Sequence, residues 1–304
     1  MTRPFGLLPI AITLALCLSW ALQQIAVKLA LPEVGPMLQG ALRSSLAALL
    51  IGLYVLLGPA RLERRAAVVV PALACGLLFG IEFIMLYQSL AWTDAARVVM
   101  FLYTAPFFVA AGGHLWFPHE RLDPKAILGI VVAFAGVVIA LEPPAAAGRE
   151  AWLGDLLALG AGAIWGLTTL VIRATELKTA PPAQVLLYSL LVSSLMFTAA
   201  VPLTGEAFVL PTGGVAIASL LYQALWVASL SYVIWLVLIA RYSATRLSVV
   251  TFVTPLFGAA LGVLLLGETL GPELAVAVAA VALGILLVSL PRRAAPAAGQ
   301  LPGG

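Results

Sequence analysis

Charged residues are scarce in this chain: Asp, Glu, Lys and Arg make up only 10% of its 304 residues, whereas 63% are hydrophobic. This composition excludes a water-soluble globular domain, because too little polar surface is available to cover an apolar core of that size. The formal net charge is only +3 and no basic cluster exceeds three residues, so we expect no nucleic acid partner. The sequence therefore predicts a protein whose solvent is the lipid bilayer.

Cysteine and histidine are also scarce, with two residues of each. Cys17 and Cys75 lie within apolar segments, which favours inert buried side chains over a disulfide or a metal site. His114 and His119 lack the i, i+4 spacing of a metalloprotease helix, and the chain has neither a pair of intramembrane Asp residues nor a phosphate-binding glycine loop. We therefore expect no catalytic residue, no cofactor and no metal, which disfavours an intramembrane enzyme. Rings of like charge and a filter-like loop are missing too, which disfavours a channel.

What the chain has instead is ten long apolar runs, separated by Pro, Gly and charged residues. Each is close to the roughly 20 residues that a helix needs to cross the hydrocarbon core. The alternating hydrophobicity of a β-barrel is missing, so we expect an all-α membrane protein with ten transmembrane helices. No small-residue cleavage site follows the first run, which predicts a retained helix and not a signal peptide. The predicted spans are residues 7–27, 36–57, 66–91, 98–117, 124–141, 151–172, 181–203, 213–240, 247–266 and 272–290.

Lysine and arginine are distributed unevenly between the two ends of these spans. With the N-terminus inside, the cytoplasmic segments hold twelve of the sixteen cations and the outer segments hold three. Because cytoplasmic loops are enriched in cations, we expect both termini in the cytoplasm, with residues 291–304 as a disordered tail. The cytoplasmic cations are Arg3, Arg61, Arg64, Arg65, Arg121, Lys125, Arg173, Lys178, Arg241, Arg246, Arg292 and Arg293, and the outer ones are Lys28, Arg97 and Arg149.

The chain also repeats itself. "WALQQIAVK" (20–28) returns as "WGLTTLVIR" (165–173), and "ARVVMFLYTAPFFVAAGG" (96–113) returns as "TRLSVVTFVTPLFGAALG" (245–262). Five spans per half is an odd number, so the second half enters the membrane from the opposite side, as in an inverted repeat. The predicted units are two five-helix repeats, at residues 7–141 and 151–290.

These paired halves, with their Trp-to-cation first helices, Arg-to-Pro fourth helices and "GETLGP" turn (267–272), resemble the drug/metabolite transporter superfamily. The resemblance is to its ten-helix EamA type, and within that to the YddG-type amino acid exporters. The first copy of the turn departs from the pattern and reads "ERLDP" (120–124). The resemblance implies a bacterial inner-membrane exporter of small metabolites that works by alternating access through a central cavity. We expect it to act as a monomer in the bilayer.

In an inverted repeat the substrate site is expected near the midplane, between the halves. Trp20 and Trp165 occupy equivalent positions there, and Gln23 and Thr168 follow each of them by one helical turn. Two such tryptophans could flank a pocket with broad apolar walls and an N–H donor. Alternatively, they only pack the helices or anchor them at the membrane interface.

Glu82 lies deep in the third span, about 14 Å from its outer end at 1.5 Å per residue. An acid at that depth is costly and suggests a function. Arg43 lies at about 10 Å depth in the second span by the same rise, so the two charges could pair. The alternative for both residues is that they only fix helix packing.

The eighth span contains "YQALWVASLSYVIW" (222–235), in which Tyr222, Trp226 and Ser229 are expected to form one helical stripe beside Gln223. Core packing is the alternative, although polar side chains in hydrocarbon need partners or water, which a cavity would supply. We expect Met85 and Tyr103 to extend the same lining.

Pro106 and Pro255 interrupt the fourth and ninth spans at equivalent positions, which predicts bends that shape the cavity or serve as hinges. The alternative is that membrane helices simply tolerate proline.

An aromatic, mostly neutral lining with one acid favours neutral or aromatic amino acids as substrates. Organic cations, held by Glu82 and aromatic rings, are the alternative.

Overall fold

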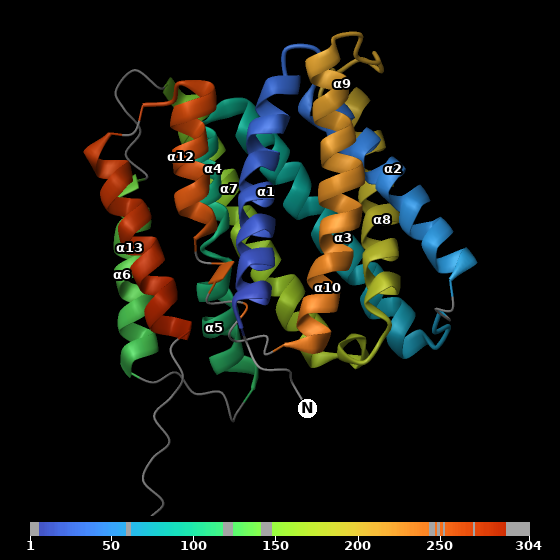
Figure 1. Ribbon diagram of the computed structural model, residues 1–304, viewed down its shortest axis with the longest axis horizontal. Coiled ribbons are helices and arrows are strands. Elements are labelled where there is room, and N and C mark those ends of the chain that lie inside the picture. The colour runs from blue at the N-terminus through green and yellow to red at the C-terminus, as the bar shows by residue number, and fades with distance from the viewer. Residues whose placement is uncertain are drawn as a thin grey trace, which may run out of the picture.

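The computed structural model describes residues 6–58, 62–117, 124–140, 148–242, 247, 250–251, 253–269 and 271–289. Every regular element in these residues is a helix, and the helices run between the two ends of one bundle (Figure 1). Seven helical stretches of the described chain are long and apolar enough to cross a membrane, and three shorter apolar helices accompany them. The described residues confirm the prediction of an all-helical, multi-pass membrane protein.

The helices of the first half lie close to the predicted spans. Proline opens α2 and α6, where its missing N–H costs no hydrogen bond, because the first helical residues have no partner within the helix. The main difference is the fourth span, which consists of two helices. The elements are α1 (Leu7–Ala30), α2 (Pro36–Leu57), α3 (Ala66–Trp92), α4 (Ala95–Leu102), α5 (Ala105–Trp116) and α6 (Pro124–Ala140).

The second half is less regular. Its eighth span is a composite of α9, a π-helix and α10, and only the later part of its ninth span, α12, is a described element. The elements are α7 (Gly148–Ala174), the 3₁₀ turn η1 (Glu176–Lys178), α8 (Pro182–Leu203), α9 (Gly214–Leu221), the π-helix η2 (Tyr222–Ser231), α10 (Tyr232–Arg241), α12 (Thr254–Leu266) and α13 (Pro272–Ser289).

Proline breaks the fourth span completely. Pro106 cannot donate a hydrogen bond, so α4 ends at Leu102 and α5 begins at Ala105. Pro255 lies in the first turn of α12 in the same way. At each break a threonine hydroxyl donates to a carbonyl three residues earlier: Thr104 to Phe101 at 2.6 Å, and Thr254 to Thr251 at 2.7 Å. Each threonine hydroxyl thereby has its hydrogen-bond partner within the protein and not in the hydrocarbon.

The π-helix changes the geometry expected for the eighth span. η2 is a π-helix, in which backbone hydrogen bonds join residues five positions apart. The Ser229 hydroxyl likewise donates to the Ala224 carbonyl, five residues earlier, at 2.8 Å. The prediction that Tyr222, Trp226 and Ser229 form one α-helical stripe is therefore wrong, because a π-turn holds more residues than the 3.6 of an α-turn.

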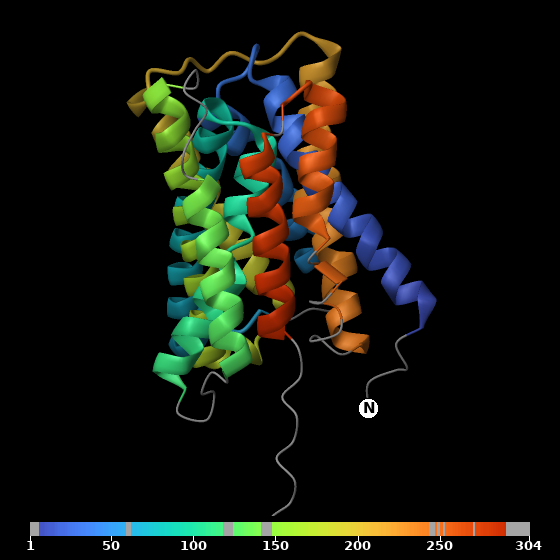
Figure 2. The ribbon, with the colours of Figure 1, turned by 90° about the vertical axis from the view of Figure 1, so that its left-hand side faces the viewer.

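Helix contacts are repeated between the two halves. α2 packs on α8, α4 on α12 and α6 on α13. α1 contacts α12 and α9 of the second half. Its counterpart α7 contacts the corresponding helices of the first half, α5 and α3. The pair α6 and α13 stands side by side at one edge of the bundle (Figure 2). This is the contact pattern that a pseudo-two-fold axis between the halves would produce.

Glycine permits the close approach of α6 and α13. A Cβ added at Gly136 would lie 2.7 Å from the Ala280 Cβ atom and 3.0 Å from the Ala277 carbonyl oxygen. A Cβ added at Gly284 would lie 2.7 Å from the Ala133 Cβ atom. Small residues at helix interfaces allow backbones to pack closely in lipid, where little hydrophobic driving force acts between helices.

Carboxylates stabilise helix starts at the end of the bundle opposite the N-terminus. Glu206, between α8 and α9, accepts bonds from the Met37 and Leu38 N–H groups, both at 3.0 Å, at the start of α2. Glu33, between α1 and α2, accepts from Thr212 at 3.2 Å and Gly213 at 2.8 Å at the start of α9. Each carboxylate also complements the positive end of the helix dipole.

The α6–α13 contact predicts a large effect of side-chain volume. Gly136→Leu should lower the free energy of unfolding by about 1–3 kcal/mol, because the added atoms must displace the backbone of α13. Thermal unfolding in detergent measures this. Gly214→Leu is the matched control, since a Cβ there meets no atom within 4 Å. Equal melting temperatures for the two variants would contradict this account of the interface.

Candidate functional site

Two opposite charges lie inside the bundle without forming a pair. Arg43 on α2 is 1% exposed and Glu82 on α3 is 6% exposed. All three Arg43 guanidinium nitrogens lack a hydrogen-bond partner, and no ion pair to Glu82 occurs among the described residues. The direct pairing considered from the sequence is therefore not formed. The guanidinium instead lies over the Phe83 ring, with its carbon 4.2 Å from the ring centroid.

Two tyrosines share this interior region. Tyr87 of α3 lies in the same buried core as Phe83, with the two ring centroids 6.3 Å apart, and Tyr232 of α10 packs against that core. We call Arg43, Glu82, Phe83, Tyr87 and Tyr232 the Arg43–Glu82 cluster. It joins α2 and α3 of the first half to α10 of the second half, which is where an inverted-repeat transporter is expected to bind its substrate.

A chain of hydrogen bonds starts at this cluster and ends on backbone. The Tyr87 hydroxyl donates to the Gln223 side-chain oxygen at 2.7 Å, and the Gln223 amide donates to the Gln39 side-chain oxygen at 3.2 Å. The Gln39 amide donates in turn to the Val27 and Val34 carbonyls, at 3.2 and 2.9 Å. Gln223 was expected to find partners in a cavity, whereas the structure satisfies it within the protein.

The two tryptophans of the repeated motif have different neighbours. The Trp20 indole N–H donates to the Ser231 hydroxyl at 3.0 Å, and its ring meets Trp235 edge to face at 5.4 Å. Trp165 meets Tyr103 edge to face at 5.5 Å, at the break between α4 and α5. Both tryptophans are only partly buried. Equivalent sequence positions thus contact different structural elements.

Each of the other predicted lining residues has its own contacts. The Tyr222 hydroxyl donates to the Ser19 carbonyl at 2.8 Å, and the Thr168 hydroxyl bonds to the Ile164 carbonyl of its own helix at 3.0 Å. Gln23 is buried, Trp226 is partly buried and the Met85 methyl packs over Gly160. Tyr103 is buried beside Thr254. Of the predicted set, the structure places Glu82 in the Arg43–Glu82 cluster and ties Gln223 directly to it.

Sequence reasoning missed Tyr87 and Tyr232. A usable signal existed for Tyr87, because it follows Glu82 on the same apolar helix and a mid-span tyrosine needs a hydrogen-bond partner. Tyr232 follows the predicted stripe of the eighth span directly, but its direction depends on the π-helix before it, which the sequence did not predict.

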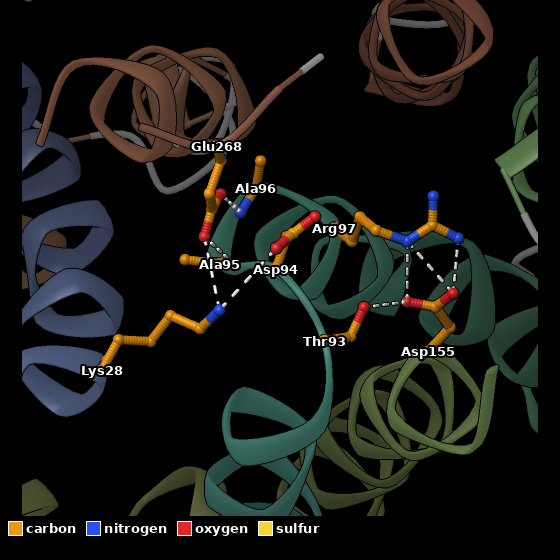
Figure 3. A network of polar contacts seen from close by, with 8 residues as sticks. All are labelled: Lys28, Thr93, Asp94, Ala95, Ala96, Arg97, Asp155 and Glu268. Atoms are coloured by element: carbon orange, nitrogen blue, oxygen red, sulfur yellow. Dashed lines mark hydrogen bonds and ion pairs between the residues drawn. The ribbon is translucent and has the colours of Figure 1, made fainter. Parts of the chain in front are cut away.

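A second polar network, seen from close by in Figure 3, lies where α1 ends, at the end of the bundle opposite the N-terminus (Figure 1). Lys28 at the end of α1 lies 3.5 Å from Glu268 and 3.9 Å from Asp94. Glu268, after α12, accepts bonds from the Ala95 and Ala96 N–H groups at 2.7 and 3.0 Å, and so caps α4. These contacts hold α1, α4 and α12 together beside a cavity of about 680 Å³.

The neighbouring pair Arg97 and Asp155 is closed and buried. Arg97 Nε donates to both Asp155 oxygens, at 3.0 and 3.1 Å, and the Thr93 hydroxyl donates to the same carboxylate at 2.9 Å. Arg97 also bonds to the Ala140 carbonyl at the end of α6. Asp155 is fully buried, so this pair joins α4, α6 and α7 as a structural element.

Comparison with known proteins agrees with this architecture. The sequence pattern of the EamA-like transporter family matches residues 7–141 and again residues 152–290. A "Probable amino-acid metabolite efflux pump" of Salmonella typhimurium is 28% identical, over 91% of this chain and 92% of the relative, and a protein of the same name from Escherichia coli is 26% identical over 89% of each. A solved crystal structure shares the fold, with a TM-score of 0.65 and 20% identity over 92% of this chain and 94% of the other. The chain belongs to the EamA-like transporter family.

Proposed function

We propose that the protein exports small neutral amino acids, aromatic ones in particular, across the bacterial inner membrane. The main observation is the Arg43–Glu82 cluster: a buried guanidinium without a hydrogen-bond partner among the described residues and a buried acid, with aromatic neighbours at the junction of the two halves. A neutral amino acid carries the same combination, since it has one positive group, one negative group and an apolar side chain. The printed names of the relatives from Salmonella typhimurium and Escherichia coli favour the same substrate class.

Transport by alternating access requires that the halves move relative to each other around the site. We propose that residues 7–141 and 151–290 form inverted five-helix repeats, ten spans in all, with both termini in the cytoplasm. The reciprocal helix contacts support this arrangement. The breaks at Pro106 and Pro255 supply points where α4–α5 and α12 could bend, and the Lys28–Glu268 contact would close the outer end.

Export of organic cations is the alternative, because Glu82 and the surrounding aromatic rings could hold a cation. The buried Arg43 charge opposes it, since a cation bound at Glu82 would also approach an unpaired guanidinium. Phosphorylated substrates are disfavoured for a related reason, because Arg43 is the one cation of this cluster.

Glu82→Gln separates the two substrate classes. The amide keeps the shape of the side chain and still accepts a hydrogen bond from an ammonium group, so phenylalanine transport in proteoliposomes should fall only a few-fold, or about 1 kcal/mol. Cation transport would collapse, because it needs the charge. As the control, unlabelled amino acids and quaternary ammonium compounds are compared as competitors of phenylalanine transport by the wild type. Abolished phenylalanine transport in a well-folded variant would favour a proton-coupled or cation-selective mechanism.

Trp20→Ala and Trp165→Ala test the lining role of the repeated tryptophans. If both rings contact substrate, phenylalanine transport per folded molecule should fall about three- to tenfold, equivalent to about 0.5–1.5 kcal/mol of aromatic contact. Melting temperature and expression should stay near wild type. Trp116→Ala, at a 50% exposed position, is the matched control. Loss of folded protein with unchanged transport per molecule would assign both tryptophans to helix packing.

Cysteine labelling tests the proposed orientation. In a background lacking Cys17 and Cys75, Glu63→Cys between α2 and α3 should resist an impermeant thiol reagent applied to intact cells, because this loop is expected to face the cytoplasm. Leu210→Cys, at a 69% exposed position before α9 at the opposite end, should react readily. The reverse labelling pattern would contradict the proposed topology.

A further inference from the structure

We propose that Arg43 binds the carboxylate of the transported amino acid and that Glu82 faces its ammonium group, so that the site selects zwitterions. This inference rests on the proposed function and specifies how the substrate is recognised. It assigns a recognition role to Arg43, for which helix packing was the competing interpretation.

Arg43 has the properties of an anion-binding group. Its side chain is 1% exposed, yet none of its three guanidinium nitrogens has a hydrogen-bond partner among the residues that the structure describes. The guanidinium stays charged at any physiological pH and presents five N–H donors in a planar fork. The guanidinium carbon lies over the Phe83 ring, 4.2 Å from its centroid, and this contact leaves the N–H donors without hydrogen-bond partners. A carboxylate is the group that matches such a fork, through two parallel charge-assisted bonds.

Glu82 supplies an acidic side chain beside the residue that Arg43 contacts. It is buried on α3 and directly precedes Phe83, whose ring lies against the Arg43 guanidinium, but the Arg43 nitrogens remain unbonded, so the two groups do not form a closed pair. A zwitterion satisfies both groups at once. An amine alone would leave Arg43 unmatched and a carboxylic acid alone would leave Glu82 unmatched, and an unmatched buried charge is costly in a low-dielectric interior.

The described part of the chain shows how this fold treats charges that serve structure. Arg97 and Asp155 are just as deeply buried, but they bond to each other directly and to Thr93 as a third group. A structural role for Arg43 would be expected to produce the same kind of closed arrangement. The neighbouring Tyr87 hydroxyl is already committed to Gln223 and does not supply it.

The test compares phenylalanine with two analogues, each lacking one of its charged groups. Phenethylamine lacks the carboxylate, and 3-phenylpropionate lacks the ammonium. In proteoliposomes containing wild-type protein, phenethylamine should compete with labelled phenylalanine at least about tenfold less well than unlabelled phenylalanine, because the charge-assisted contact to Arg43 is lost. 3-Phenylpropionate should compete at least a few-fold less well, because the weaker contact to Glu82 is lost. Equal competition by phenethylamine would overturn the proposal without any variant being made.

Arg43→Gln then assigns the carboxylate preference to this residue. Phenylalanine should bind at least about tenfold more weakly, whereas phenethylamine should change little, so the preference between the two should nearly vanish. Arg43→Lys keeps the charge but not the fork and should show an intermediate preference. Arg64→Gln, at an exposed position in the loop before α3, is the matched control and should behave as wild type.

The outcomes separate this inference from the function on which it rests. A uniform loss of transport in Arg43→Gln, with the phenylalanine-to-phenethylamine preference intact, would show a structural role and overturn the inference alone. If Arg43→Gln does not fold, the analogue competition in the wild type still decides. If the wild type moves quaternary ammonium compounds but no amino acid, both the proposed function and this inference fail.

Discussion

A polar group inside a lipid bilayer has to find its partner within the protein, and this constraint governs most of the structure. Where proline breaks a helix, the hydroxyls of Thr104 and Thr254 bond to nearby backbone carbonyls. Where helices begin, Glu33, Glu206 and Glu268 accept from N–H groups that no helix can satisfy by itself. Because several of these bonds join the two halves of the chain, the same constraint also ties the halves together.

The Arg43–Glu82 cluster is informative because it does not obey this constraint. Burying a guanidinium without a hydrogen-bond partner costs free energy, and a bound ligand that supplies the missing partner would offset this cost. The requirement for such a partner restricts the chemistry of the ligand more than the shape of the site does. An amino acid brings both missing charges and an apolar side chain for the aromatic surroundings. Transport then needs a change of access between the halves, for which we propose the proline breaks and the contacts around Glu268 as the movable parts.

The sequence predicted most of the helices, because composition and apolar runs respond to the bilayer directly. Pro106 and Pro255 were located correctly as interruptions, since a missing N–H acts locally. The π-helix at Tyr222–Ser231 was not predicted, because it depends on packing against α1 and α2. The same gap explains why Tyr232 was missed. Trp20 and Trp165 show a further limit: the repeat predicts equivalent positions, but each neighbourhood depends on side chains that the repeat does not conserve.

The most direct measurement of the central claim is an experimental structure of the full-length protein with phenylalanine bound. The account predicts density for the ligand between α2, α3 and α10, with its carboxylate within hydrogen-bond distance of the Arg43 guanidinium and its ammonium beside Glu82. Phenylalanine bound elsewhere, with Arg43 and Glu82 bonded directly to each other, would contradict it.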